Sequence, residues 1–419
     1  MRISKLGVVG ILCAVGTSSA EIGVPFPAVA PAQRAIGRGL PNADSDFEPV
    51  TRSGIIPDMD QTQDFALNRA FRIYGNFSGP QALRIAAIRD DGAVFMGVID
   101  FRANSYAVVV PAGNYSLRSC YVGIVSTFDD PDPVVVTADT QRDEMLPAFT
   151  SYTVSGVVTG VSPGLFAAID LRSQDQRTSS AGLIDPGNGT YSANAPSGIY
   201  DANVLQVDFA AGTTSSYAVG TVMVSDGDAM MDFAVGTTGQ LSGTVMMTSI
   251  PPGSVMLAVD SVPSPSGFNC AVPQRTFGSG PVNPSSGFYR TTQLTGRTYF
   301  LGGAFPILPA DPPQTAGTWQ WIDPMLVDFQ GDTVRDATVS PPAETITISG
   351  QVTVAGADGA VAAASVGAAC EGPSSGTGLP PTTFARGTQT DAAGNYQLVV
   401  PNAPFMQCAL TVNGPPPTP

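Results

Sequence analysis

Histidine is absent from this 419-residue chain, so acid–base catalysis by an imidazole is impossible. The Ser-His-Asp and Cys-His arrangements and histidine-containing zinc sites are therefore excluded. Paired carboxylates could in principle hydrolyse glycosides, but no acidic pair lies in a recognisable cleft motif. We expect a protein without enzymatic activity and without a bound cofactor.

Aspartates recur in pairs four residues apart, a spacing that could serve a metal ion. Two carboxylates four apart on a strand share one face, and acidic clusters such as residues 129–132 could bind Ca²⁺. None of the segments contains the D-x-[DN]-x-[DN]-G pattern of a calcium loop. Solvated strand ends explain the acids more simply, so we expect no metal site. The four segments are 60–67 (DQTQDFAL), 139–146 (DTQRDEML), 228–235 (DAMMDFAV) and 332–339 (DTVRDATV).

The cysteines point to structural rather than catalytic chemistry. Cys370 and Cys408 lie in one repeat unit near the C-terminus, on its second and penultimate candidate strands. A disulfide between them would stabilise a domain with a thin core; the alternative is a pair of buried thiols. Cys120 and Cys270 are too far apart in the chain to share one compact unit, and we expect no bridge between them.

Two tryptophans lie in one short stretch that could bind a ligand. Trp319 and Trp321 are two residues apart, so on a strand both indoles point to the same side. Such a pair could form an aromatic platform for a sugar. The alternative, which we prefer, is that both rings pack against their own sheet or the next domain.

The first twenty residues are typical of an export signal. Arg2 and Lys5 precede an apolar run, residues 6–16, that is too short to span a bilayer, and small residues follow before Glu21. No later segment is long and apolar enough to cross a membrane, so we expect none after cleavage. Cleavage would leave 17 arginines against 34 acidic residues, a net charge of −17, which disfavours nucleic-acid binding.

Three sequence elements recur four times in the same order. The first is the motif S-G-x-V, which begins at Ser155, Ser242 and Ser349 and has a divergent copy at residues 74–77. The second is a turn and a tyrosine, followed five residues later by Pro and then by an aromatic, as in 391–405. The third is the Asp-x-x-x-Asp segment described above. Apolar alternation has period two, and Gly and Pro punctuate the chain every 8 to 12 residues.

The period of the repeat, about 80 to 107 residues, is too long for a solenoid and fits a β-sandwich of about seven strands. We therefore predict an all-β protein, a tandem array of about four sandwiches. The expected divisions are a signal peptide (1–20), a flexible leader (21–57), four sandwiches (58–149, 150–237, 238–343 and 344–413) and a Pro-rich tail (414–419).

The order S-G-x-V, a small-residue strand and then D-x-x-G-N-Y-x-L-x-V-P resembles the carboxypeptidase regulatory-like domain. The resemblance covers roughly residues 58–413 and is strongest in the fourth unit. It implies a prealbumin-like sandwich, a fold often grouped with carbohydrate-binding-like folds, and leaves function open.

Our first functional hypothesis is an exported structural or adhesive protein, a rod of four sandwiches that acts as a spacer or surface scaffold. It would lie outside the cell, on its surface or in a periplasm, with glycans or surface proteins as partners. The alternative is a carbohydrate-binding protein that uses the tryptophan pair or an end loop.

Counting strands adds a question about the two ends of the array. In the family that the units resemble, the element after the paired strands closes the sandwich, and the Asp-x-x-x-Asp segment fits that role for units one to three. Unit four is not followed by such a segment, and the N-terminal copy has no unit before it. Residues Asp60, Asp64, Phe65 and Leu67 of this copy could complete unit four of another molecule, which would build head-to-tail filaments. The simpler expectation, which we prefer, is that this segment packs on unit one and unit four keeps an open edge.

Overall fold

The computed structural model describes residues 47–121, 125–148, 150–175, 177–260, 276–307, 317–322, 326–356, 359–372 and 382–414. The predicted signal peptide, most of the predicted leader, Cys270 and residues 415–419 lie outside them. The described residues form strands and turns without a helix, which confirms the all-β prediction. No helix in this part of the chain is long and apolar enough to cross a membrane.

The strands fall into four units that follow the sequence repeat. Unit one holds β4 (Phe71–Ser78), β5 (Ala82–Arg89), β6 (Val94–Met96), β7 (Val98–Asp100), β8 (Ser105–Val110), β9 (Gly113–Tyr121), β10 (Val125–Asp129), β11 (Val134–Val136), β12 (Thr140–Gln141) and β13 (Glu144–Met145). Unit two holds β14 (Tyr152–Thr159), β15 (Phe166–Ser173), β16 (Thr178–Leu183), β17 (Thr190–Ala195), β18 (Gly198–Asp208), β19 (Thr213–Val224), β20 (Ala229–Met230) and β21 (Phe233–Ala234).

The other two units lie in the second half of the chain, with one exception. Unit three holds β22 (Thr238–Met246), β23 (Val255–Val259), β24 (Phe277–Pro281), β25 (Phe288–Leu294), β26 (Arg297–Ile307), β27 (Gly317–Ile322), β28 (Val327–Phe329), β29 (Thr333–Val334) and β30 (Ala337–Thr338). Unit four holds β31 (Thr345–Val354), β32 (Ser365–Glu371), β33 (Thr383–Gln389), β34 (Asn395–Pro401) and β35 (Gln407–Asn413). It also contains β1 (Val50–Ile55), β2 (Gln61–Thr62) and β3 (Phe65–Leu67), from the start of the chain.

Each unit has an outer sheet with the same pairing. Its first strand (β4, β14, β22 or β31) pairs antiparallel with β8, β17, β25 or β34. On its other side it pairs in parallel with a strand in two short halves, which we call the closing strand: β12–β13, β20–β21, β29–β30 or β2–β3. The Asp-x-x-x-Asp segments contain these closing strands.

Alternation explains why these segments form strands. In β34, Tyr396, Leu398 and Val400 are buried, whereas Asn395 and Gln397 between them are exposed. The strand begins at a turn in which Asp391 accepts the backbone N–H of Asn395 (2.8 Å). Gly394 in this turn has a φ of 77°, a conformation that favours glycine. Period-two burial on a turn-initiated strand is thus the basis of this part of the repeat.

The second aromatic of the repeat closes the corner after the broken strand. The hydroxyl of Tyr115 donates to the carbonyl of Pro111 (2.9 Å), and Tyr200 does the same to Pro196 (3.0 Å). Unit four has Phe405 at this position, without a hydroxyl and 54% exposed.

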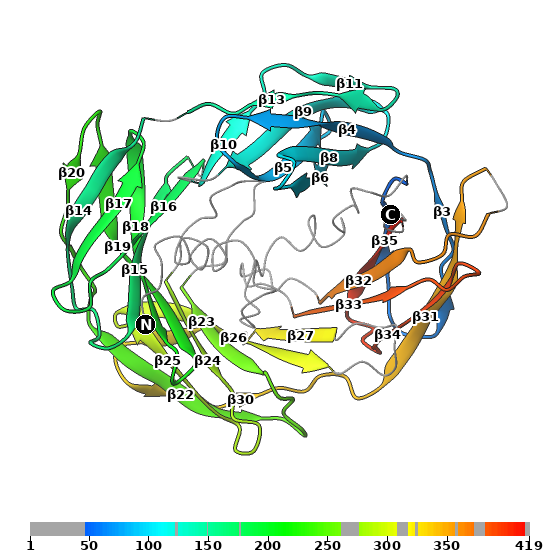
Figure 1. Ribbon diagram of the computed structural model, residues 1–419. Helices are drawn as coiled ribbons and strands as arrows, with labels where there is room; N and C mark the ends of the chain where they lie inside the picture. Colours follow the sequence, from blue (N-terminus) through cyan, green and yellow to red (C-terminus); the bar gives the residue numbers. More distant parts are fainter. Residues whose placement is uncertain are drawn as a thin grey trace.

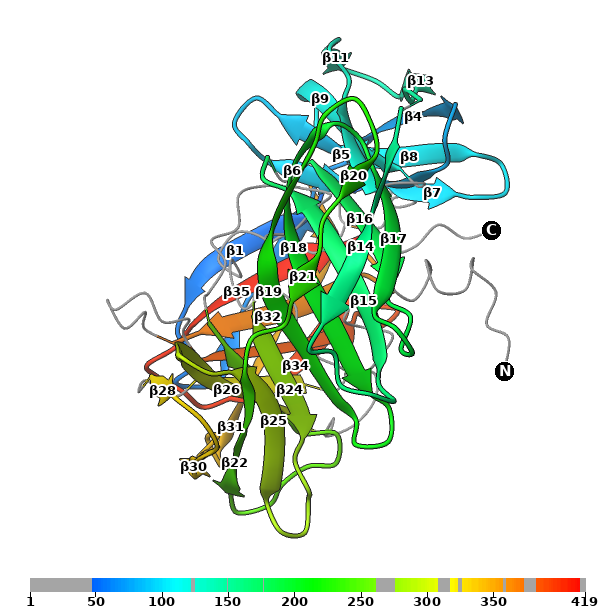
Figure 2. The same cartoon turned by 90° about the vertical axis from the view of Figure 1, so that its left-hand side faces the viewer.

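In unit one, β7 also belongs to the outer sheet, where it pairs with β8. The remaining strands belong to one sheet of eighteen strands that runs through all four units. Three pairings between units make it continuous: β10 with β16, β19 with β24, and β27 with β33. Figure 1 shows the four units around a ring, with this sheet toward the centre and the closing strands on the outside. After a 90° turn, unit two faces the viewer, with unit one above it and unit three below (Figure 2).

The two ends of the described chain meet in unit four. We call residues 47–67 the strap; β1 of the strap pairs with β35, and β2 and β3 pair with β31. Figure 1 shows the blue strap beside the orange and red strands of unit four. The expectation that residues 60–67 pack on unit one, with an open edge on unit four, is therefore wrong, because their partners are the backbone groups of β31. The prediction of a flexible leader is wrong for residues 50–55, which form β1.

The ring also corrects the expected rod. A rod requires each unit to contact only its neighbours in sequence, whereas here the first strands complete the last unit. One buried core contains Phe65 and Leu67 of the strap, Ile348 and Tyr396 of unit four, and Trp319 of unit three, among others. Units two and one have separate cores.

Candidate functional site

The three recurring sequence elements meet at one point in every unit. In unit four, the backbone carbonyl of Gln63 in the closing segment lies over Gly350, where a Cβ atom would approach that oxygen to 2.1 Å. The Tyr396 hydroxyl donates to the same carbonyl (2.6 Å), and the N–H of Gln63 donates to the carbonyl of Ser349 (2.7 Å). The glycine, the tyrosine and the aspartate segment are therefore parts of one junction, which we call the closure junction.

The same closure junction occurs in the other three units. A tyrosine hydroxyl donates to the carbonyl of the residue before the second aspartate, and a glycine lies beneath that carbonyl. The donor–acceptor pairs are Tyr106–Arg142 (2.6 Å), Tyr191–Met231 (2.7 Å) and Tyr289–Arg335 (2.6 Å), over Gly75, Gly156 and Gly243.

The paired aspartates are backbone acceptors rather than metal ligands. In unit four, Asp60 accepts the N–H of Thr347 (2.7 Å) and Asp64 accepts the N–H of Gln351 (2.9 Å). These carboxylates take the place of carbonyl acceptors where the closing strand is interrupted, so the first strand keeps its hydrogen bonds. The other N–H–carboxylate pairs are Arg72–Asp139, Asn76–Asp143, Thr153–Asp228, Val157–Asp232, Gln240–Asp332 and Thr244–Asp336.

The sequence analysis did not predict that the aspartates accept backbone N–H groups, although the spacing of the motifs indicates it. The first aspartate of each segment accepts the N–H of the residue three positions before the motif glycine, and the second accepts the N–H of the residue just after it. The two acceptor positions are therefore four residues apart, like the two aspartates. No group of three or more potential metal ligands occurs among the described residues.

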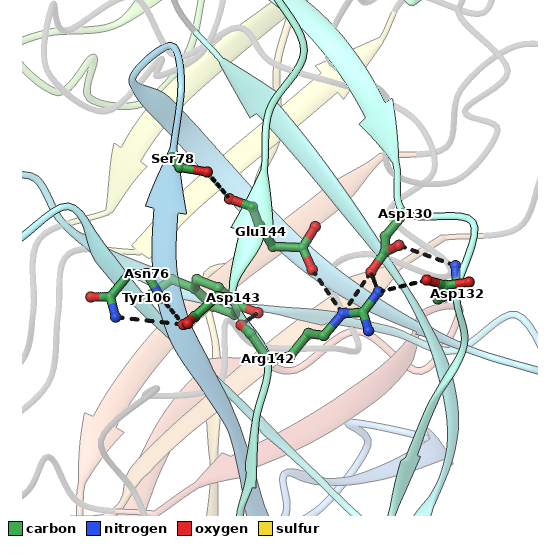
Figure 3. Close-up of polar contacts among 8 residues, drawn as sticks. All are labelled: Asn76, Ser78, Tyr106, Asp130, Asp132, Arg142, Asp143 and Glu144. Carbon is green, nitrogen blue, oxygen red and sulfur yellow. Dashed lines mark hydrogen bonds and ion pairs between the residues drawn. The ribbon is translucent and has the colours of Figure 1, made fainter.

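Unit one departs from the pattern just after its second aspartate, and Figure 3 shows the result. Phe65, Phe233 and Ala337 fill this position in the other units, and all three are buried. Unit one has Glu144 there, and its side chain is 2% exposed. A carboxyl group therefore occupies a place that is apolar elsewhere in the ring.

Arg142 lies between Glu144 and two further acids. Its guanidinium donates to Asp130 Oδ2 from Nε (2.9 Å) and from Nη2 (2.5 Å), and lies 3.4 Å from Asp132 Oδ2. Arg142 Nε is 3.6 Å from Glu144 Oε1, beyond a normal hydrogen bond. Arg142 also supplies the carbonyl of the closure junction, so the charged cluster and the junction are connected through one residue (Figure 3).

Burial raises the pKa of Glu144 to about 8, and the negative charge of Asp130 adds to this rise, whereas Arg142 opposes it. Burial likewise raises the pKa of Tyr106. The cluster can therefore hold a proton near neutral pH.

The tryptophan pair lies at the contact between units three and four. Trp319 is 3% exposed and lies in the buried core, opposite Phe305 of β26 and Phe384 of β33. Trp321 is partly buried against the same core. Burial leaves the Trp319 ring no open face for a sugar, whereas a ligand on Trp321 stays a prediction.

The disulfide prediction is confirmed: Cys370 and Cys408 are bonded and face each other across β32 and β35. Cys120 is also disulfide-bonded, and its partner is outside the described residues, as is Cys270. The expectation that Cys120 and Cys270 are not joined is therefore untested.

Comparisons with known proteins are weak. No family model and no curated protein sequence matches the chain. Similar solved structures include a leucine-rich repeat protein from Bacteroides thetaiotaomicron (12% identity, 40% of this chain and 26% of that one, TM-score 0.17). Another is a streptococcal ancillary pilin (12% identity, 65% of this chain and 100% of that one, TM-score 0.16). A third is the major pilin subunit of Bacillus cereus (9% identity, 65% of this chain and 99% of that one, TM-score 0.16). These TM-scores are too low to support an argument on fold or function.

Proposed function

We propose that the chain is an exported, non-enzymatic structural or adhesive protein whose four sandwiches act as a closed ring on or outside the cell surface. The observation that carries the proposal is the strap in unit four, because it joins the ends of the array and leaves no sandwich without its closing strand. The units would be related to carboxypeptidase regulatory-like modules, on the strength of the motifs alone.

A disulfide on neighbouring strands supports an oxidising location. The chain's polar interior groups also support a structural role: the tyrosine and aspartate side chains of the closure junctions all bond to backbone. The partners would be surface proteins or glycans, contacted by the outer sheets or loops.

The first test is localisation. The full-length chain should be recovered in an exported fraction with Glu21 as its first residue and without binding to the membrane after a salt wash. Recovery in the cytoplasm with Met1 or Arg2 as the first residue would contradict the proposal.

The second test asks whether adhesion needs the closed ring. Leu67 is fully buried in the strap and its neighbour Ala66 is exposed, so Leu67→Asp should open the ring and Ala66→Asp should not. Small-angle scattering should show a larger radius of gyration for Leu67→Asp only. Attachment of cells carrying the two variants is then compared, and equal attachment would contradict a role for the ring. Separately, turnover of any substrate by the wild type would contradict a non-enzymatic protein.

A further inference from the structure

The strap supplies unit four with strands that each of the other units takes from its own stretch of sequence. In units one to three, the strand after β9, β18 or β26 pairs with it, and the closing strand follows. In unit four the equivalents of both strands are β1 and β2–β3 of the strap. The aspartates of the closing strand bond backbone 67, 75 and 92 residues away in units one to three, but 287 residues away in unit four.

Side-chain contacts also hold the two halves of the strap together. Arg52 of β1 donates to the Gln63 side chain (2.6 Å) and to the Asp64 carbonyl (3.1 Å), and its guanidinium lies 5.0 Å from the centre of the Phe65 ring. These contacts join its two halves. Because they lie within the strap, these contacts are kept whichever copy of unit four the strap closes.

The strap continues into unit one through residues 68–70, and Phe47 of the strap forms a backbone bridge with Arg69 of this link. The other three contacts between neighbouring units are strand pairings. The equivalent pairing here would join β1 to β6, and it does not occur among the described residues, in which β1 pairs with β35 and β6 with β5.

We propose that the strap also closes unit four of a second copy of this chain. The partner is the same protein, because the acceptor groups are those that the strap satisfies within its own ring: the N–H groups of Thr347 and Gln351, the hydroxyl of Tyr396 and the space above Gly350. The contact is heterologous, so copies joined in this way form an exchanged dimer or a longer closed or open series.

Closure within one chain and between chains makes the same contacts. The ratio between the two is therefore set by the concentration of copies relative to the effective concentration of the chain's own strap, roughly millimolar for a short tether. Dilute protein consists of single rings, and exchange occurs where copies are crowded while unit four is still open. This inference does not depend on export or adhesion.

The test is a cysteine pair that records which chain supplies the strap. Thr62 of β2 and Ser349 of β31 are register partners, so Thr62→Cys/Ser349→Cys links the strap to its acceptor. The matched control is Val334→Cys/Ser242→Cys, the same register position in unit three, whose closing strand comes from its own unit. Both proteins are refolded at about 1 µM and at about 1 mM, oxidised and run on non-reducing gels, with the new links identified by peptide mapping.

We expect the strap variant to be monomeric from dilute refolding and to give dimers and larger species, joined through positions 62 and 349, from concentrated refolding. The control should give only internal links at both concentrations. Monomers alone at both concentrations, or oligomers without links between 62 and 349, would overturn the proposal.

A second measurement does not use engineered cysteines. Gly350→Val blocks the acceptor, and Leu67→Asp disables the donor. A mixture of the two full-length variants still contains one intact strap and one intact acceptor, so it should form a 1:1 heterodimer in light scattering, which neither variant forms alone. Absence of the heterodimer would also overturn the proposal.

Discussion

The Tyr396 hydroxyl donates a 2.6 Å hydrogen bond to the backbone carbonyl of Gln63, a residue 333 positions earlier in the chain. Corresponding bonds in the other units join residues only 36 to 46 positions apart. The same local chemistry thus completes a unit in three cases and the whole ring in the fourth.

Gly350→Ala should destabilise unit four, because the new Cβ would lie 2.1 Å from the Gln63 oxygen and the strap would have to move. We expect a loss of about 1–3 kcal/mol, as for other overpacked sites, measured by urea unfolding. Gly367→Ala in β32 is the control, since its nearest neighbouring atom would be 4.0 Å away. It should be neutral or stabilising; equal losses would refute the closure junction.

Tyr396→Phe removes the hydroxyl and leaves the Gln63 carbonyl without this donor, which we expect to reduce stability by about 1–2 kcal/mol. Hydrogen exchange should become faster at the strap amides. Tyr289→Phe removes the same bond in unit three and should speed exchange in β29 and β30 while leaving the strap unchanged. Faster strap exchange in both variants would mean that the units do not close independently.

The raised pKa of Glu144, about 8, predicts a pH dependence. Glu144 holds its proton more tightly in the folded protein than in the unfolded chain, where its pKa is about 4.5. The folded state therefore binds more protons between roughly pH 4.5 and 8, and the free energy of unfolding falls as the pH rises through this window.

Glu144→Gln should remove this fall, because the amide does not titrate. Glu144→Phe, which introduces the residue found at positions 65 and 233, should do the same. From pH 5 to pH 9, the free energy of unfolding of each variant should rise by at least about 1 kcal/mol relative to that of the wild type, since one pKa unit corresponds to 1.4 kcal/mol. Urea titrations at pH 5, 7 and 9 measure this; parallel curves for all three proteins would show that Glu144 does not titrate there.

Removing the disulfide by Cys370→Ala/Cys408→Ala should reduce stability by about 2–4 kcal/mol, because the bond restricts the unfolded chain between positions 38 residues apart. Thermal unfolding of the wild type with and without reductant gives an independent value. Non-reducing peptide mapping should recover the two positions linked, and it will also identify the partner of Cys120.

Much of the fold could be predicted from the sequence, because strands, turns and repeats depend on local patterns. Period-two burial in β34 and the spacing of the motifs gave the sandwich units, and counting strands showed that unit four lacks its own closing strand. The count could not show which molecule supplies that strand. This depends on the curvature of the array, and the pairings that set it, such as β10 with β16, involve short strands without a distinctive pattern.

The candidate site was less predictable for related reasons. Strand alternation placed Trp319 and Trp321 on one side, but burial of Trp319 depends on Phe384 of the next unit. The aspartates were assigned to solvent because a carboxylate that accepts backbone N–H groups has no composition signal of its own. Glu144 could have been noticed as the single acid at a position that is otherwise Phe or Ala.

The position of the strap has a consequence for the timing of synthesis. Units one to three can complete themselves as their residues emerge, because every strand of each unit is close in sequence. The strap emerges before all of them and has no acceptor until β31 and β34 have been made, more than 270 residues later. Its apolar side chains, Phe65 and Leu67, are therefore unprotected for most of translation, and holding chaperones or slow passage through a translocation channel would govern the yield of rings.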